Sequence, residues 1–186
     1  DPATSTFFGI PVAAEQGAAA VARTFDNDAG TRAGAVHVFR DSADGWFEEA
    51  KLTGSDTLAG DQFGFGLALE GGLLVAGAPF HDGTGADTGA AYVFTDEGGV
   101  WVQRARLTAS DPTAFANFWI RVAVADGTIA VGAAPSEFRF PDPSLAPDEA
   151  VYVFEQVEGA WIQTARGTGS DAVLGDDFGE AVSLSG

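Results

Sequence analysis

Cysteine and methionine are absent from the sequence, and lysine occurs once, as Lys51. Without cysteine the chain has no disulfide framework, so thiols give no information about its redox compartment. No window holds the roughly 18 consecutive apolar residues that a membrane-spanning helix requires. The N-terminus also lacks the charged and apolar regions of a signal peptide. We therefore expect no membrane insertion.

Positive charge is scarce. The 27 acidic residues outnumber the 9 basic ones and give a net charge of −18. Such a charge repels phosphate backbones and anionic membranes, so we expect no nucleic-acid partner. The acidic bias, with aspartate in excess over glutamate, suits a protein that stays soluble in concentrated salt, and we keep this as a hypothesis about its habitat.

Helical patterns are missing as well. The 186 residues are 46% hydrophobic and include 25 glycines and 15 phenylalanines. Short runs of Val, Ile and Thr lie between the glycines, which favours many short strands joined by tight turns. The composition is that of a chain that folds around a core.

Three residue types recur at an interval of 55 residues, which lengthens to 60 at the last step. The members of this register are Phe8, Phe63, Phe118 and Phe178, then Trp46, Trp101 and Trp161, then Asp1, Asp56, Asp111 and Asp171. The periodicity predicts a single repeat domain over residues 1–186, with repeats at 1–55, 56–110 and 111–170 and the start of a fourth at 171–186.

The second repeat predicts four strands, at Phe63–Glu70, Leu73–Ala78, Ala90–Phe94 and Trp101–Leu107. Glycine pairs at 71–72 and 98–99 supply the positive φ angles of tight hairpin turns. The second strand is apolar throughout, which indicates burial on both faces. The fourth alternates, which predicts an outer strand with Trp101, Gln103, Ala105 and Leu107 on one face.

Four antiparallel strands per repeat predict an all-β fold made of β-propeller blades, about three of them plus the start of a fourth. A β-sandwich is the alternative. It would explain alternating strands but not the return of Phe, Asp and Trp at a fixed interval.

The motifs Phe63-Gly64 and Gly77-Ala78-Pro79 resemble the FG-GAP repeat of integrin α-chain propellers and of bacterial surface proteins. The other repeats depart from this pattern in part. Phe8-Gly9 and Phe178-Gly179 are kept, Ala22-Arg23-Thr24 replaces the second motif in the first repeat, and Trp119 follows Phe118 where glycine is expected. In this interpretation the motif residues and the repeat tryptophans build the fold and do not carry chemistry.

Propellers of this family usually have about seven blades, and a ring of that size needs far more residues than this chain has. We therefore expect a piece of a longer protein. The edge that it leaves open would be completed by the remaining blades of the same protein or by another chain.

The resemblance implies calcium as a possible cofactor, but the family's usual DxDxDG loop is absent, because the corresponding connections are short and poor in carboxylates. A weaker candidate is Asp26-Asn27-Asp28, where carboxylates and an amide alternate. The alternative interpretation is a turn in which these side chains bond their own backbone. The sequence indicates no cofactor other than calcium.

The third repeat carries the longer loop. Four of the eight prolines of the chain fall between residues 135 and 147 and flank Phe138-Arg139-Phe140. A stiffened loop with aromatic and guanidinium groups is a candidate contact surface for a ligand. Trp119 and Arg121, which break the repeat motif, are further candidates, although core packing also explains the indole.

Catalytic motifs are lacking. His37 and His81 belong to no recognisable triad or metal motif. Asp61, Asp176 and Asp177 precede repeat phenylalanines and are expected to cap turns. A pair of carboxylates acting as in glycosidases stays possible among so many acidic residues.

We therefore expect a non-enzymatic segment that presents loops to a protein or glycan ligand. The resemblance implies adhesion and a cell-surface or extracellular location. The alternatives are a fragment of a carbohydrate-active propeller enzyme and a purely structural spacer.

Overall fold

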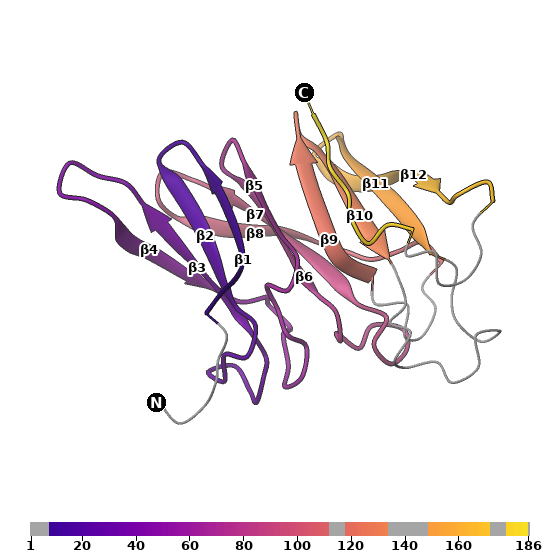
Figure 1. Ribbon diagram of the computed structural model, residues 1–186, viewed down its shortest axis with the longest axis horizontal. Coiled ribbons are helices and arrows are strands. Elements are labelled where there is room, and N and C mark those ends of the chain that lie inside the picture. Colours follow the sequence, from indigo (N-terminus) through magenta and orange to yellow (C-terminus); the bar gives the residue numbers. More distant parts are fainter. Residues whose placement is uncertain (1–7, 112–117, 134–148, 172–177, 186) are drawn as a thin grey trace.

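The computed structural model describes residues 8–111, 118–133, 149–171 and 178–185, which contain twelve strands and no helix. The strands form three antiparallel four-stranded sheets that stand side by side (Figure 1). In each sheet the strands are ordered as they follow in the chain. The predicted all-β architecture of propeller blades is confirmed, and the array of blades is open.

The strand bounds are similar in the three sheets. The first sheet holds β1 (Phe8–Glu15), β2 (Ala18–Arg23), β3 (Ala35–Arg40) and β4 (Phe47–Leu52). The second holds β5 (Leu67–Glu70), β6 (Leu73–Ala78), β7 (Ala90–Asp96) and β8 (Trp101–Leu107). The third holds β9 (Phe118–Ala125), β10 (Thr128–Ala133), β11 (Ala150–Val157) and β12 (Ala160–Gly167).

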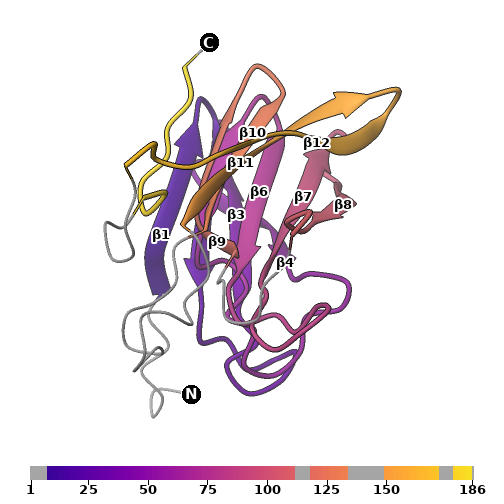
Figure 2. The same cartoon turned by 90° about the vertical axis from the view of Figure 1, so that its right-hand side faces the viewer.

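The first strands of the sheets contact one another, β1 with β5 and β5 with β9. Viewed from the side, β1 lies on one side of the molecule and β8 and β12 lie on the other (Figure 2). This is the arrangement of propeller blades, with an innermost and an outermost strand in every sheet.

The predicted strands of the second repeat are confirmed at β6 and β8, and β7 extends two residues further than expected. The first strand was predicted too long, since β5 begins at Leu67 and not at Phe63. Gly64 has a positive φ of 92°, and the N–H groups of Gly64 and Phe65 both donate to the carbonyl of Gly77. The chain therefore turns between Phe63 and Leu67, and Phe63 pairs instead with Gly34 of the first sheet.

The predicted glycine turns are present. Gly71 and Gly72 have φ values of 58° and 75°, and Gly98 and Gly99 have 70° and 93°. L-residues with a side chain adopt these values only at a cost, which explains the glycine pairs.

The predicted single face of β8 is wrong. The pairing of β7 with β8 shifts between Val93 and Phe94, which is a β-bulge in β8. Because a bulge inserts one residue, the alternation of side chains changes at that point. Trp101 packs toward the first sheet, whereas Ala105 and Leu107 pack toward the third.

Two apolar clusters hold the three sheets together, one in each gap between neighbouring sheets. The second sheet faces the first with large side chains, among them Phe63, Leu74, Tyr92 and Phe94. The first sheet contributes small side chains to the same gap, such as Ala18, Ala20, Val36 and Val38. The gap between the second and third sheets repeats this pattern with the equivalent positions, including Val122, Ile129, Tyr152 and Phe154 on the third sheet.

The two motifs of the repeat meet in these gaps. A Cβ atom on Gly64 would lie 2.9 Å from Cγ2 of Val36 and 3.2 Å from Cβ of Ala22, both in the preceding sheet. In the same way a Cβ atom on Gly132 would clash with the carbonyl oxygen of Gly179. Gly64 and Gly179 thus each pack on the position of the Gly-Ala-Pro glycine in the preceding repeat, and there is no room for a side chain.

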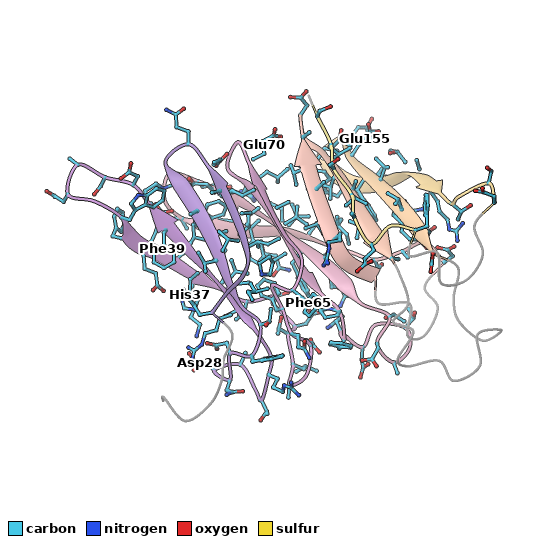
Figure 3. All side chains as sticks on the ribbon, in the orientation of Figure 1. Asp28, His37, Phe39, Phe65, Glu70 and Glu155 are labelled. Carbon is cyan, nitrogen blue, oxygen red and sulfur yellow. The ribbon has the colours of Figure 1, made fainter. Side chains whose placement is uncertain are left out.

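The outer face of the first sheet has no sheet packed on it within the described part of the chain. Phe8, Ile10, Val12 and Trp46 are each more than half exposed there. Phe8 is equivalent to Phe63, which is fully buried against the preceding sheet, and Trp46 is equivalent to Trp101. His37 and Phe39 lie on the same side of the molecule (Figure 3).

Candidate functional site

Loops from the first and second sheets meet at one end of the molecule. Asp28, in the β2–β3 loop, lies at this end, opposite Glu70 and Glu155 (Figure 3). The segment between β4 and β5 pairs with the β2–β3 loop, since Gly60 donates to the carbonyl of Thr31 and Gln62 to that of Arg32. The β6–β7 loop adjoins it through the hydrogen bond from Phe80 N–H to the Asp61 carbonyl.

A polar hollow of about 370 Å³ lies between these loops. Three segments line it, and their residues are Arg32 from the β2–β3 loop, Leu58, Ala59, Gly60, Asp61 and Gln62 from the β4–β5 segment, and Phe80, Asp82 and Asp87 from the β6–β7 loop. In the described part of the chain, five residues other than glycine have a positive φ, and three of them line this hollow. Such backbone positions concentrate at functional sites.

Asp61 is the most deeply placed carboxylate of the hollow, with a side chain only 6% exposed. Its Oδ2 accepts the Leu58 N–H at 2.9 Å, which is the turn cap expected from the sequence. The same oxygen lies 2.9 Å from Nδ1 of His81. Two donors thus fix the orientation of this carboxylate.

His81 lies directly behind Asp61 and is itself buried. Nη1 of Arg106 is 3.2 Å from Nε2 of His81. Since a guanidinium only donates, Nε2 is the acceptor and Nδ1–H donates to Asp61. The imidazole therefore connects Asp61 to Arg106, and Arg106 in turn contacts Asp56.

Asp56 forms a hydrogen bond with a tyrosine, and the same kind of hydrogen bond recurs in the third repeat. The Tyr92 hydroxyl donates to Asp56 at 2.8 Å, and the Tyr152 hydroxyl donates to Asp111 at 2.9 Å. Burial raises the pKa of Asp56, but the Tyr92 hydroxyl and the Arg106 charge outweigh it and lower the pKa below its usual 3.8. Burial and the neighbouring Asp56 raise the pKa of Tyr92. Because the pair recurs, we assign it to architecture.

The pair Asp61 and His81 does not recur in this way. The positions equivalent to Asp61 are Thr6, Ala116 and, in the partial fourth repeat, Asp176, and those equivalent to His81 are Asp26 and Ser136. Sequence reasoning missed this pair because its members lie 20 residues apart and match no motif. The only available signal was that both positions vary between repeats.

The candidate calcium residues Asp26, Asn27 and Asp28 lie in the β2–β3 loop near the hollow. Lys51 Nζ donates to Asp26 at 2.9 Å and to Asp28 at 2.6 Å, and Arg23 donates to Asp26 at 3.1 Å. Asp26 Oδ1 accepts the Asp28 N–H, and Asn27 accepts the Arg32 N–H. Burial raises the pKa of Asp26, but the Asp28 N–H and Lys51 lower it overall.

The hydrogen bonds from the Asp28 and Arg32 N–H groups to Asp26 and Asn27 are those of a turn whose side chains bind its own backbone. Within the residues that the structure describes, no three His, Asp or Glu side chains are grouped as metal ligands. Calcium binding at this loop stays a prediction.

The structure describes only part of the other candidate residues. Phe138, Arg139 and Phe140 lie outside the described residues. Trp119 belongs to strand β9. Arg121 lines a second hollow of about 420 Å³, which is mostly apolar and is formed with Ile10, Pro11, Thr24, Phe25 and Phe65. A ligand at any of these residues stays a prediction.

Three neighbouring four-stranded sheets, each built from one repeat and joined through Phe-Gly and Gly-Ala-Pro positions, define an open segment of a β-propeller. The FG-GAP repeat model matches residues 46–94 and 101–154, more than half of the chain. The chain belongs to the FG-GAP repeat family. Each match begins at a repeat tryptophan, in or next to the last strand of one sheet, and ends in the third strand of the next.

Among solved structures, that of Sqt1 from Saccharomyces cerevisiae is similar, with a TM-score of 0.51 and 14% sequence identity. The similarity covers 87% of this chain and 36% of that one, so the chain spans about a third of the length of this β-propeller-type protein. At this identity the likeness supports the fold alone. A comparison with curated proteins found no match.

FG-GAP repeats are generally non-enzymatic and occur in extracellular and surface proteins. In the described ranges, no helix is long and apolar enough to cross a bilayer.

Proposed function

We propose that the chain is a non-enzymatic ligand-binding segment of a surface or secreted protein, and that its loops bind a protein or a glycan. The observation that carries this proposal is the contrast between the sheets and one end of the molecule. Equivalent positions are buried in both gaps between the sheets, whereas the loops at the end near Asp28 differ between repeats and enclose a polar hollow. Loops on a rigid scaffold are where binding residues concentrate.

The test is binding of the 186-residue chain to an array of glycans and to candidate surface proteins, with hydrolysis of the same glycans measured in parallel. We expect binding without turnover. Binding that disappears when residues 136–146 are replaced by a Gly/Ser linker would place the ligand at the proline-rich loop. Glycan turnover would support the alternative of a carbohydrate-active enzyme, and neither binding nor turnover would support a structural spacer.

We further propose that the outer face of the first sheet packs against another sheet of the same type, from remaining blades of the same protein or from another chain. Two internal gaps support this. Phe63, Leu67 and Trp101, which are equivalent to Phe8, Val12 and Trp46, pack in the first gap, and Val122 and Trp161 pack in the second. Unpartnered apolar faces of this kind are sites of association.

Sedimentation of the chain over a range of concentrations tests association through this face. We expect self-association that Trp46→Glu weakens and that Val157→Glu, at another exposed apolar residue, leaves unchanged. Equal association of all three proteins would contradict a role of this face.

A further inference from the structure

We propose that the hollow between the first two sheets binds one neutral sugar ring of a glycan, with the Asp61 carboxylate as the hydrogen-bond acceptor for its hydroxyl groups. This inference rests on the proposed function and narrows it to one site and one class of ligand. It is independent of the proline-rich loop of the third repeat.

The arrangement of Asp61 is the first argument. Both of its hydrogen bonds to described residues use Oδ2, which accepts from Leu58 N–H and His81 Nδ1–H. Oδ1 has no hydrogen-bond partner among the described residues, although the side chain is 94% buried and Asp61 lines the hollow. A carboxylate that is held in place on one oxygen and available on the other is a preorganised acceptor for a ligand hydroxyl.

The repeat itself provides the second argument. The Asp-Tyr network and the two motifs recur and are explained by folding. Among the three repeats that form sheets, the Asp61–His81 pair belongs to the second, since Thr6 and Ala116 stand at the positions equivalent to Asp61; Asp176 of the partial fourth repeat is the other equivalent. Three sheets of one architecture form although only one has this pair. Blade formation therefore does not require a buried Asp–His pair at this position, and burying such a pair is costly.

The composition of the hollow indicates a sugar. Its volume of about 370 Å³ lies at the lower end of the range of about 300–1,000 Å³ that is usual for small-molecule sites. Arg32 and Gln62 supply donors, Asp61 and Asp82 supply acceptors, and Phe80 supplies an aromatic ring. A sugar ring presents the matching groups, with hydroxyls that both donate and accept and a C–H face that packs on an aromatic ring.

Charge decides between neutral and acidic sugars. Three carboxylates and one guanidinium line the hollow, and the chain as a whole has a net charge of −18. Carboxylate or sulfate groups on a sugar would be repelled both locally and at long range. The site therefore selects neutral hexoses over uronic or sialic acids.

The experiment uses the 186-residue chain, an array of neutral and acidic oligosaccharides, and two soluble probes, methyl β-D-galactopyranoside and methyl α-D-mannopyranoside. Leu58 is 65% exposed at the rim of the hollow, so Leu58→Trp fills the space without removing a polar group. Val100 is 63% exposed in the β7–β8 turn at the other end of the sheet, and Val100→Trp is the matched control. Asp61→Asn removes the acceptor charge.

We expect neutral glycans to bind, and at least one of the probes to show a dissociation constant that Leu58→Trp and Asp61→Asn raise about tenfold or more and Val100→Trp leaves unchanged. Asp61→Asn also weakens a turn, so its melting curve is recorded. If this variant is unfolded, the test is decided by Leu58→Trp. Failure of neutral glycans to bind, equal binding by Leu58→Trp, or a preference for acidic glycans would overturn the inference.

A separate variant distinguishes this failure from failure of the proposed function. If glycans or proteins bind equally well to Leu58→Trp but not to a chain with Phe138→Ala and Phe140→Ala, the segment is a binding scaffold and the hollow is not its site. If the wild-type chain binds no glycan and no protein, both proposals fail.

Discussion

At the scale of single residues, equivalent positions of the repeat can be compared with one another, because they occur in different surroundings. Phe63 is fully buried between the first two sheets, in edge contact with Tyr92 and Phe94. Phe8 is the equivalent residue of the first sheet and is 55% exposed. The same residue type at the same position of the repeat therefore contributes differently to stability.

We expect Phe63→Ala to lower the free energy of unfolding by about 3–5 kcal/mol, because it leaves a cavity in the core. Phe8→Ala should cost less than about 1 kcal/mol, because more than half of this residue is exposed and its loss leaves no enclosed cavity. Urea unfolding of both variants measures the difference. Equal losses would mean that the outer face of the first sheet is covered in solution.

The glycines that follow these phenylalanines form a second pair. Gly9 and Gly64 have nearly the same φ, 96° and 92°. A Cβ atom on Gly9 would meet no atom within 4 Å, whereas on Gly64 it would meet Val36 at 2.9 Å. Substitution thus adds backbone strain at both positions but a steric clash at one.

We expect Gly9→Ala to cost about 1–2 kcal/mol through strain alone. Gly64→Ala should cost about 1–3 kcal/mol more, since the preceding sheet must move. Thermal unfolding under identical conditions compares the two. A Gly64→Ala variant no less stable than Gly9→Ala would contradict the close packing of the sheets.

At the scale of strands and sheets, hydrogen bonds between neighbouring sheets also recur. Glu15 accepts from the N–H groups of Gly71 and Gly72, and Glu70 accepts from the N–H of Asp126 in the same way. In each case a carboxylate at the end of one first strand binds the hairpin turn of the next sheet. These contacts fix the position of each sheet along the strand direction of its neighbour.

One contact of this kind depends on pH. The Arg40 guanidinium donates two hydrogen bonds to Glu49, and Trp101 of the second sheet donates a third at 2.9 Å. The Arg40 hydrogen bonds, followed by that of Trp101, lower the pKa of Glu49 below its usual 4.5 although burial opposes the shift. A lowered pKa in the folded state means that the stabilisation is present above pH 4.5 and is lost as the pH falls through the lowered value.

We therefore expect Glu49→Gln to cost about 1–3 kcal/mol at pH 7 and progressively less as the pH falls below 4.5. Urea unfolding at a series of pH values measures this dependence. Glu155→Gln, at an exposed position of β11, is the control and should change little at any pH. A constant difference between Glu49→Gln and the wild type across the series would show that the charge of Glu49 is not what links the sheets.

The third sheet lacks this link. Trp161 is equivalent to Trp101, but the residue equivalent to Glu49 is Arg104, which pairs with Glu97. The Nε1 atom of Trp161 is buried and has no partner among the described residues. The repeat tryptophan is thus kept for packing, and its hydrogen bond is not required in every sheet.

At the scale of the whole molecule, the net charge of −18 destabilises the folded state. Like charges on a compact chain repel one another, and salt screens this repulsion. We expect the melting temperature to rise by at least about 3 °C between low and molar NaCl, which corresponds to roughly 1 kcal/mol for a chain of this size. Equal melting temperatures in both conditions would contradict a salt-adapted surface.

Most of the sheet architecture could be predicted from the sequence. The apolar run of β6, the glycine pairs that end the hairpins and the interval between equivalent residues were enough to place β6, β7 and β8. Two features were not predictable. The bulge in β8 moves Trp101 to the other side of its sheet, and Gly64 turns the chain before β5. Both depend on the partner strand or the neighbouring sheet.

The candidate site was the least predictable part. The residues that line the hollow come from three loops, and Asp61 and His81 carry no motif. Of the candidates that the sequence did offer, Arg121 lines the other hollow, and Asp26 to Asp28 share the β2–β3 loop with Arg32 but do not line the polar hollow. A motif search finds residues that are close in sequence, whereas this site is built from segments that are close only after the sheets have packed.

Periodicity, glycine pairs and apolar runs act over a few residues of chain, so they were enough to predict the repeat, the fold class and the hairpin turns at 71–72 and 98–99. The tertiary structure alone decided which face each side chain occupies and which polar groups meet. Those choices follow from the packing of large side chains of one sheet on the small side chains of another. Asp61, His81 and Arg106 come from three segments of the second repeat, and only the folded chain brings them into one network.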